Sequence, residues 1–201
     1  MRCFYTNANS LTGKIVELKE RIKDFDIIGI VETWANDEIR ESELKIDAYE
    51  MHRVDRRGRK GGGVILYIRD SLRSAIQSSL MNIGFEDSVW CSVELKSCRL
   101  LVGLCYRSTS SKEQNNNKRI QLFEEAMKYE RLTHTLIMGD FNYLNIDYKT
   151  QSVTAGSGTD STKFFETIHF IQDLFLVQQV LEPTRIREGA DSICSGLYIY
   201  K

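Results

Sequence analysis

Short apolar runs recur along the chain, and most of them end in a polar cluster. Residues 27–31 read Ile-Ile-Gly-Ile-Val, a β-branched run typical of a strand buried on both faces. In residues 89–95, apolar side chains alternate with polar or aromatic ones, which predicts a half-buried strand. A turn at 96–99 then leads into the strand 100–106, so we expect an antiparallel pair. Runs of the same kind predict further strands at residues 49–54, 64–68, 135–138 and 176–180.

Other segments repeat their apolar positions at helical spacing. Ile15, Leu18, Ile22 and Phe25 place one apolar face on a helix expected over residues 11–25. Three more helices are expected: at 36–44, at 119–129, and after a cap at Asp160. Polar surface loops are expected at 108–118, which holds three consecutive asparagines, and at 150–159.

The order of these elements predicts an α/β (α+β) fold in which a mixed sheet is covered by outer helices. No linker or internal repeat divides the chain, so residues 1–201 are expected to form a single domain. This length is enough to bury a sizeable core without disulfides.

Composition removes several classes of protein. Lys plus Arg (27) and Asp plus Glu (28) nearly cancel, so the chain has no strongly basic coat for nucleic acid. The apolar runs are too short to cross a bilayer, and Met1 is not followed by a signal-peptide core. The five cysteines include no C-x-x-C pair, which favours reduced, structural thiols. We therefore expect an intracellular protein, nuclear or cytoplasmic, with no membrane partner and no obligate protein partner.

Candidate chemistry gathers where the predicted strands end. The clusters are Thr6-Asn7-Ala8-Asn9, Glu32-Thr33-Trp34, Tyr106-Arg107 and Gly139-Asp140-Phe141-Asn142. Loops at strand ends are where α/β proteins tend to build sites. Carboxylate and amide oxygens suit Mg²⁺ or Mn²⁺ and can orient an attacking water. Each cluster alone has an ordinary reading, as a solvated loop residue or a side chain closing its own turn. Their shared position after buried strands favours one site.

These pieces, taken in order, resemble the endonuclease/exonuclease/phosphatase superfamily, and most closely the endonuclease domains of non-LTR (LINE-type) retrotransposons. The matching segments are 6–11, 31–34, Gly61-Gly62-Gly63 with the strand 64–67, 106–107, 139–147 and Glu182-Pro183-Thr184-Arg185. The resemblance implies a four-layer sandwich of two mixed β-sheets flanked by helices. It also implies Mg²⁺-dependent (or Mn²⁺-dependent) phosphodiester hydrolysis with DNA as the substrate.

The resemblance assigns roles only at matching positions. Glu32 resembles the family's metal-binding glutamate, and Asn9 stands where relatives have a residue that assists at the metal. Asn7 resembles the asparagine that contacts the scissile phosphate or orients the nucleophile, and Tyr106 resembles the tyrosine that contacts the phosphate. Asp140 resembles the residue that activates the attacking water, with Asn142 as its partner at the phosphate.

The late part of the family pattern is missing. An ungapped comparison from Pro183 puts Gly196 where relatives have an aspartate that orients a histidine, and no Ser-Asp-His follows before Lys201. His52 lies in a predicted strand, His134 before one and His169 inside a predicted helix. By position none of them replaces the missing histidine, and each is expected to be structural or solvated. A positioned acid or base contributes about 10²–10⁴-fold in rate. The sequence therefore predicts a C-terminally incomplete domain, with the last strands missing and an unpaired sheet edge, and weak or no nuclease activity.

A basic loop follows the strand 49–54. Its cations Arg56, Arg57, Arg59 and Lys60, together with Arg107, are candidate nucleic-acid contacts, because phosphate contacts dominate nucleic-acid affinity. The alternative is a solvated hairpin. The glycines that follow are not a phosphate-binding loop, since no Gly-Lys-Ser/Thr comes after them.

Three functions remain open at this point. The first is a retroelement-derived DNA endonuclease. The second is a degenerate, non-catalytic remnant that binds nucleic acid or a protein partner. The third is a phosphatase or phosphodiesterase of the same superfamily that acts on a small phosphate ester, since likeness of fold does not choose a substrate.

Overall fold

The computed structural model describes residues 1–129, 133–143, 146–147, 150, 152–153, 162–166, 169, 176–178, 185–187, 190–193 and 196–200. Its helices are α1 (Ile15–Arg21), α2 (Glu41–Leu44), α3 (Ser78–Met81) and α4 (Glu113–Met127), and residues 162–166 are also helical. Beside the two main sheets lie two small hairpins, β9 (Ile146–Asp147) with β10 (Ser152–Val153) and β12 (Arg185–Arg187) with β13 (Ala190–Ile193).

The first sheet has the strand order β1-β2-β4-β3. Its strands are β1 (Cys3–Asn7), β2 (Ile27–Val31), β3 (Tyr49–Val54) and β4 (Val64–Arg69). The first two strands run parallel because α1 carries the chain back between them, and the other pairings are antiparallel. As a result, β1 and β2 end at the same edge of the sheet.

The second sheet has the order β11-β14-β8-β7-β6-β5. Its strands are β5 (Arg73–Ile76), β6 (Ser88–Glu94), β7 (Arg99–Tyr106), β8 (His134–Asp140), β11 (Leu176–Gln178) and β14 (Gly196–Tyr200). The expected antiparallel pair at 89–106 is confirmed, and β7 and β8 are parallel across α4. Both sheets are therefore mixed, as expected.

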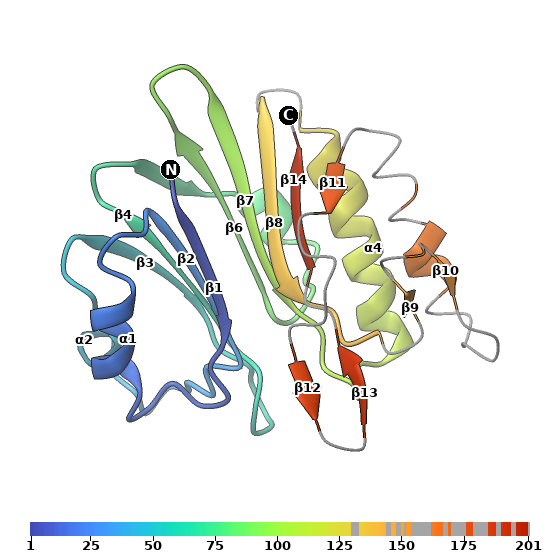
Figure 1. Cartoon of the computed structure of the whole chain (residues 1–201), viewed down its shortest axis with the longest axis horizontal. Coiled ribbons are helices and arrows are strands. Elements are labelled where there is room, and N and C mark those ends of the chain that lie inside the picture. Colours follow the sequence, from blue (N-terminus) through green and yellow to red (C-terminus); the bar gives the residue numbers. More distant parts are fainter. Residues whose placement is uncertain are drawn as a thin grey trace.

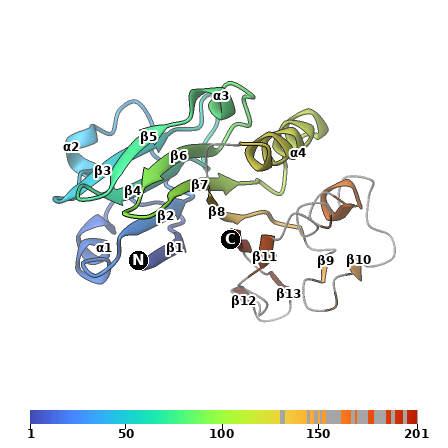
Figure 2. The same cartoon turned by 90° about the horizontal axis from the view of Figure 1, so that it is seen from above.

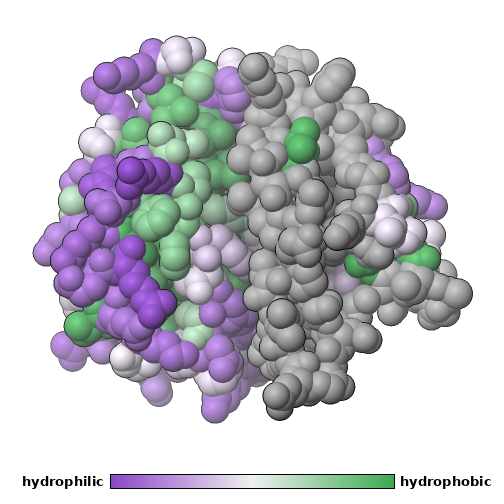
Figure 3. Space-filling view, viewed as in Figure 1, coloured by the Kyte–Doolittle hydropathy of each residue, from purple (hydrophilic) through white to green (hydrophobic). Residues whose placement is uncertain are grey.

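The two sheets lie face to face, with α1 and α2 outside the first and α4 outside the second (Figure 1). The view from above shows the same layers (Figure 2). On the face seen in Figure 3, hydrophilic residues gather over the side of α1, and a more apolar band lies beside the grey atoms. The four-layer sandwich is thus confirmed.

Strand alternation explains why the apolar runs are continuous. In β2, Ile27 and Val31 face the second sheet, whereas Ile28 and Ile30 pack under α1 and α2. In β6, Val89 lies between the sheets and Trp90 packs against α4. Each central strand therefore has two buried faces, the pattern expected of covered sheets.

Helix limits were less predictable. The helix expected over 11–25 is only α1, and of 36–44 only α2 is helical. The polar stretch before Arg119 was interpreted as loop, yet α4 begins at Glu113. There Asn115 accepts the Glu86 N–H at 3.1 Å and Asn116 accepts the Arg107 Nε–H at 3.0 Å. Long-range partners thus override the weak helix propensity of asparagine. Asp160, the predicted cap of the next helix, lies outside the described residues.

The structure also locates the cysteines and histidines. Cys91 and Cys105 are buried in the core, but Cys98 is only half-buried, in the turn after β6. Burial raises the pKa of Cys91 to about 12, so this thiol is protonated and inert at neutral pH. Cys194 lies outside the described residues. Within the described part of the chain, no helix is both long enough and apolar enough to span a membrane.

Candidate active site

The carboxyl ends of four strands from two sheets meet at one edge of the sandwich. Asn7 ends β1 and pairs in register with Val31, the last residue of β2. Tyr106 ends β7 and pairs with Asp140, the last residue of β8. Glu32 follows directly after Val31, so the polar clusters of the sequence become neighbours.

Hydrogen bonds join these clusters across the two sheets. The Asn7 Nδ2–H donates to Asp140 Oδ2 at 3.2 Å, which links β1 to β8. The Tyr106 hydroxyl donates to Glu32 Oε1, which links β7 to the end of β2. Glu32 and Asp140 therefore lie at the same mouth between the stacked sheets, as the sequence predicted.

Glu32 is held by three uncharged donors. Besides the Tyr106 hydroxyl, its Oε2 atom accepts the Trp34 indole N–H at 2.5 Å and the Gly62 backbone N–H at 3.0 Å. No lysine or arginine of the described residues forms an ion pair with this half-buried carboxylate. The nearby Arg56 guanidinium acts on this carboxylate only through space, because its own hydrogen bonds go to Asp87.

The backbone around Glu32 is strained. Glu32 has a φ of 55° and Trp34 a φ of 56°. Both values lie in the left-handed region, which residues other than glycine and asparagine seldom occupy. Such conformations persist where surrounding contacts impose them, and they gather at functional sites. Here the strained residue is the one whose carboxylate accepts the Tyr106 hydroxyl.

Tyr106 is a hydrogen-bond donor that resists ionisation. Burial raises the pKa of Tyr106 well above its usual range. The hydrogen bond and charge of Glu32, and the charge of Asp140, raise it further, while Arg56 opposes them. The phenol is therefore neutral at physiological pH and can donate to an anionic oxygen.

Asp140 and Asn142 form a tight turn at the end of β8. Asp140 is buried, and its Oδ1 atom accepts the Asn142 backbone N–H at 3.2 Å. Asn142 has a φ of 50° and donates its Nδ2–H to the Arg107 carbonyl at 2.7 Å. This turn fixes the carboxylate at the mouth of the sheets.

Asn9 and Arg107 differ from the other candidates. Asn9 is exposed, and its backbone N–H donates to Asn7 Oδ1 at 3.1 Å. The buried Arg107 turns inward, where its Nε–H donates to Asn116 Oδ1 and its Nη1–H to the Asn142 carbonyl, at 3.0 and 3.2 Å. Arg107 therefore braces the turn that carries Asn142.

The basic loop splits into a buried and an exposed part. The Arg56 side chain is only 6% exposed and is paired with Asp87. Arg57, Arg59 and Lys60 are exposed, with Lys60 Nζ lying 5.3 Å from the centre of a Trp34 ring. Arg59 Nη2 lies 3.0 Å from Glu86 Oε2, so an outside phosphate would compete with Glu86 for this guanidinium.

A polar cavity of about 360 Å³ extends this exposed part. Lys112 and Lys118 of the α4 region line it together with Arg57 and Arg59. Sequence reasoning missed these two lysines, because 50 residues of intervening sequence hide their proximity to the basic loop. It also missed Asp87, whose role depends on partners far along the chain.

The donors present suit a hard divalent cation. The described residues contain no cluster of three His, Cys, Asp or Glu side chains. Mg²⁺, however, is usually held by one or two carboxylates, waters and a substrate phosphate. Glu32, whose hydrogen-bond donors are uncharged, fits that requirement.

The pairing of β14 with β8 also places Gly196, the position where relatives have the late aspartate, beside the site. Gly196 in β14 pairs with Gly139, the residue before Asp140. A glycine offers no side chain at this position. The strand β14 pairs with β8 along its whole length, from Gly196 to Tyr200.

Comparisons with known proteins agree with this architecture. The sequence pattern of the Endonuclease/Exonuclease/phosphatase family matches residues 1–183. Among solved structures, the chain is similar to the endonuclease domain of TRAS1, a telomere-specific non-LTR retrotransposon, with a TM-score of 0.65 and 11% identity over 98% of this chain and 84% of that one. No curated protein sequence is significantly similar to the chain.

Two further solved structures have comparable similarity. The AP endonuclease LMAP from Leishmania major has a TM-score of 0.64 and 14% identity, over 98% of this chain and 78% of that one. The 3′-5′ exonuclease NExo from Neisseria meningitidis has a TM-score of 0.64 and 14% identity, over 100% and 87% of the two chains. With its fold, its strand-end clusters and a match over most of its length, this chain belongs to the Endonuclease/Exonuclease/phosphatase family of hydrolytic nucleases and phosphatases.

Proposed function

We propose that the chain is a divalent-metal-dependent phosphodiester hydrolase of endonuclease type, derived from a retroelement, that acts on DNA slowly. One observation carries the proposal: the Asn7–Asp140 and Tyr106–Glu32 hydrogen bonds bring the ends of four strands to one site. A phosphate seated there would meet amide and phenol donors on one side and two carboxylates on the other.

Each side chain has a role in this proposal. Glu32, with the exposed Asn9 beside it, would hold Mg²⁺ or Mn²⁺ through oxygen atoms. When bound, the metal stabilises negative charge on the phosphate and its leaving oxygen. Asn7 donates a hydrogen bond to a phosphate oxygen, and Tyr106 would turn its one O–H from Glu32 to the phosphate when the substrate binds. Asp140 accepts a proton from the attacking water, and Asn142 orients the phosphate.

The substrate class is proposed from the cations. Arg57, Arg59 and Lys60 lie on the loop beside Glu32, and Lys112 and Lys118 continue them along one cavity. Such a series of cations follows a phosphate backbone better than it encloses one small ester. The structural neighbours, which include endonucleases and an exonuclease, support the same choice.

Slow hydrolysis is proposed because no histidine reaches the site in the described residues. His52 lies in β3 against Ser74, and His134 begins β8, at the opposite end of the strand from Asp140. His169 lies beside Phe165, on a helical segment. Loss of one positioned acid or base lowers the rate by about 10²–10⁴-fold. This favours a second candidate function, nucleic-acid binding without cleavage.

Nicking of a supercoiled plasmid with Mg²⁺ separates the two candidates. We expect slow nicking that Glu32→Gln and Asp140→Asn abolish, with Glu38→Gln as a matched control on the exposed surface. DNA binding by both site variants without nicking by the wild type would favour the second candidate. Nicking that is insensitive to Glu32→Gln and Asp140→Asn would contradict the proposed site.

A metal titration tests the site without relying on activity. A ligand present at tenfold its Kd stabilises the folded state by about 1.4 kcal/mol. For a chain of this size, that shift raises the Tm by roughly 3–6 °C. We expect Mn²⁺ to produce such a rise in the wild type and in Glu38→Gln, but not in Glu32→Gln.

A further inference from the structure

Arg56 and Asp87 form a buried ion pair next to the candidate site. The Arg56 Nε–H donates to Asp87 Oδ2 at 2.8 Å, and Nη2–H donates to the same oxygen. The two side chains are only 6% and 2% exposed. Burial opposes the charge of Arg56, but the hydrogen bond and charge of Asp87 outweigh it and raise the pKa of Arg56. Breaking such a pair leaves an uncompensated buried charge.

Asp87 also contacts two segments that carry site residues. Its Oδ1 atom accepts the Gly63 N–H at 2.9 Å, which fixes the end of the β3–β4 hairpin. Its backbone carbonyl accepts the Tyr106 N–H at 2.8 Å, which fixes the end of β7. A single residue at the start of β6 thus connects the hairpin to Tyr106.

The glycine turn of the hairpin passes this constraint to Glu32. Gly62 N–H donates to Glu32 Oε2 at 3.0 Å, and the Gly62 carbonyl accepts the Trp34 N–H at 3.0 Å. Arg56 supports the other side of the carboxylate, since its guanidinium lies 5.4 Å from the Tyr106 ring centre. Both oxygens of Glu32 are therefore held by groups that contact the ion pair.

We infer that Arg56 and Asp87 are positioning residues that orient Glu32 through Gly62 and Tyr106, rather than contacts to nucleic acid. The inference rests on the proposed metal-binding role of Glu32 only for its effect on metal affinity. Residues that orient metal ligands typically change metal affinity by about 10–100-fold when replaced. The orientation of Glu32 itself can be measured without metal.

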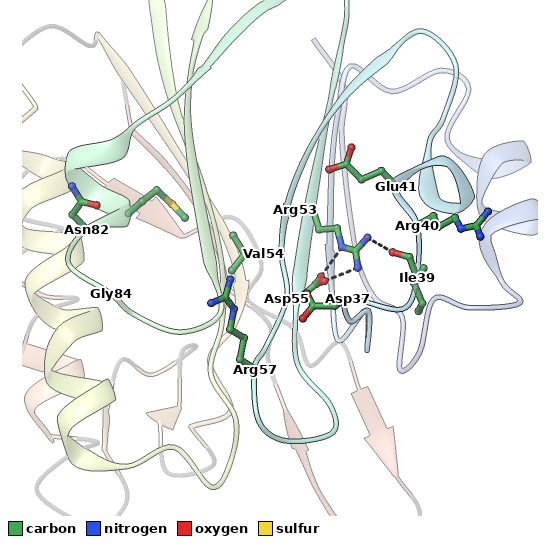
Figure 4. Close-up of a pocket in the computed structure, with 11 residues that line it drawn as sticks. Asp37, Ile39, Arg40, Glu41, Arg53, Val54, Asp55, Arg57, Asn82 and Gly84 are labelled. Atoms are coloured by element: carbon green, nitrogen blue, oxygen red, sulfur yellow. Dashed lines mark hydrogen bonds and ion pairs between the residues drawn. The ribbon is translucent and has the colours of Figure 1, made fainter.

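A second ion pair on the same hairpin provides a matched control. Arg53 Nε–H and Nη2–H donate to the two Asp55 oxygens at 2.7 and 2.5 Å, and the side chains are 11% and 16% exposed. Arg53 also donates to the carbonyls of Asn36 and Ile39. It lines a cavity that has Asn82 and Gly84 on the side facing the hairpin (Figure 4). Its hydrogen bonds reach neither Glu32 nor Tyr106.

The experiment compares two double variants, Arg56→Met with Asp87→Leu and Arg53→Met with Asp55→Leu. Replacing both members of a pair by apolar groups avoids leaving a buried charge, so both proteins are expected to fold. Two readouts are used: the NMR resonance of the Trp34 indole N–H, which donates to Glu32, and Mn²⁺ affinity by calorimetry. Glu32→Gln provides the reference for a weakened indole hydrogen bond, and Trp34→Phe assigns the resonance.

We expect the Arg56/Asp87 variant to shift the indole resonance toward its Glu32→Gln position and to weaken Mn²⁺ binding tenfold or more. The Arg53/Asp55 variant should change neither. If the Arg56/Asp87 variant does not fold, Arg56→Gln with Asp87→Asn removes both charges and keeps polar side chains, with the same expectation. An unchanged indole resonance in whichever of these two double variants folds, or an equal shift in the Arg53/Asp55 protein, would overturn the inference. If the wild type binds no Mn²⁺, the proposed function fails, while the indole resonance still decides the positioning role.

Discussion

Alanine at Gly62 tests how closely the basic hairpin is packed against the site. Gly62 has a φ of 73°, and a Cβ there would overlap the Arg56 guanidinium, 2.6 Å from Nη2 and nearer still to Nε and Cζ. Gly58 in the same hairpin has nearly the same φ, 75°, but a Cβ there meets nothing within 4 Å. The two positions therefore share the backbone penalty and differ only in the side-chain overlap.

The expected free energies follow from these two terms. A left-handed conformation costs an L residue about 1–2 kcal/mol, so Gly58→Ala should lower the free energy of unfolding by that amount. At Gly62 the guanidinium must move, and breaking its buried pair with Asp87 adds about 3–5 kcal/mol. Gly62→Ala should then lose roughly 4–7 kcal/mol, much of the roughly 5–15 kcal/mol by which domains are stable.

Urea unfolding measured by far-UV circular dichroism checks this difference. The same two substitutions are then made in an Arg56→Ala background, where no guanidinium remains to be displaced. There we expect Gly62→Ala and Gly58→Ala to lose the same 1–2 kcal/mol. Equal losses in the wild-type background, or an undiminished Gly62 penalty in the Arg56→Ala background, would refute this account of the hairpin.

Three other predictions concern the core, the pH dependence and the phenol. Gly103→Ala would place a Cβ 2.5–2.7 Å from the Trp90 ring. This overpacking should lower the free energy of unfolding, measured with urea, by about 1–3 kcal/mol. An unchanged free energy of unfolding would contradict the packing. Burial lowers the pKa of His52 in spite of nearby Glu50, so the unfolded chain binds the proton first. Stability should therefore fall as the pH drops below about 6.5, and it should fall less in His52→Gln. Urea midpoints at pH 8 and 5 measure this; an equal change of midpoint in the wild type and in His52→Gln would count against it. Tyr106→Phe should lower kcat for nicking with little change in DNA affinity, because it removes one donor to the proposed phosphate; an unchanged kcat would exclude that role.

Local pattern alone determined most of the layered fold. The run from Ile27 to Val31 predicted a strand with two buried faces, and β2 has them because helices cover one side of its sheet and the second sheet covers the other. The alternation through Val89 and Val93 likewise specified β6, since side-chain direction reverses at each residue. The helix limits were not determined locally, because Asn115 and Asn116 are helical only through partners outside their own segment.

The candidate site likewise has one part that the sequence predicts and another that only the tertiary structure determines. The sequence put Asn7, Glu32, Tyr106 and Asp140 at strand ends, and parallel pairing of β1 with β2 and of β7 with β8 brings such ends together. Only the tertiary structure decided that Arg56 faces inward while its neighbour Arg57 faces solvent. That choice depends on Asp87, 31 residues away, whose buried carboxylate requires a cation, and no local pattern reports a partner so distant in the chain.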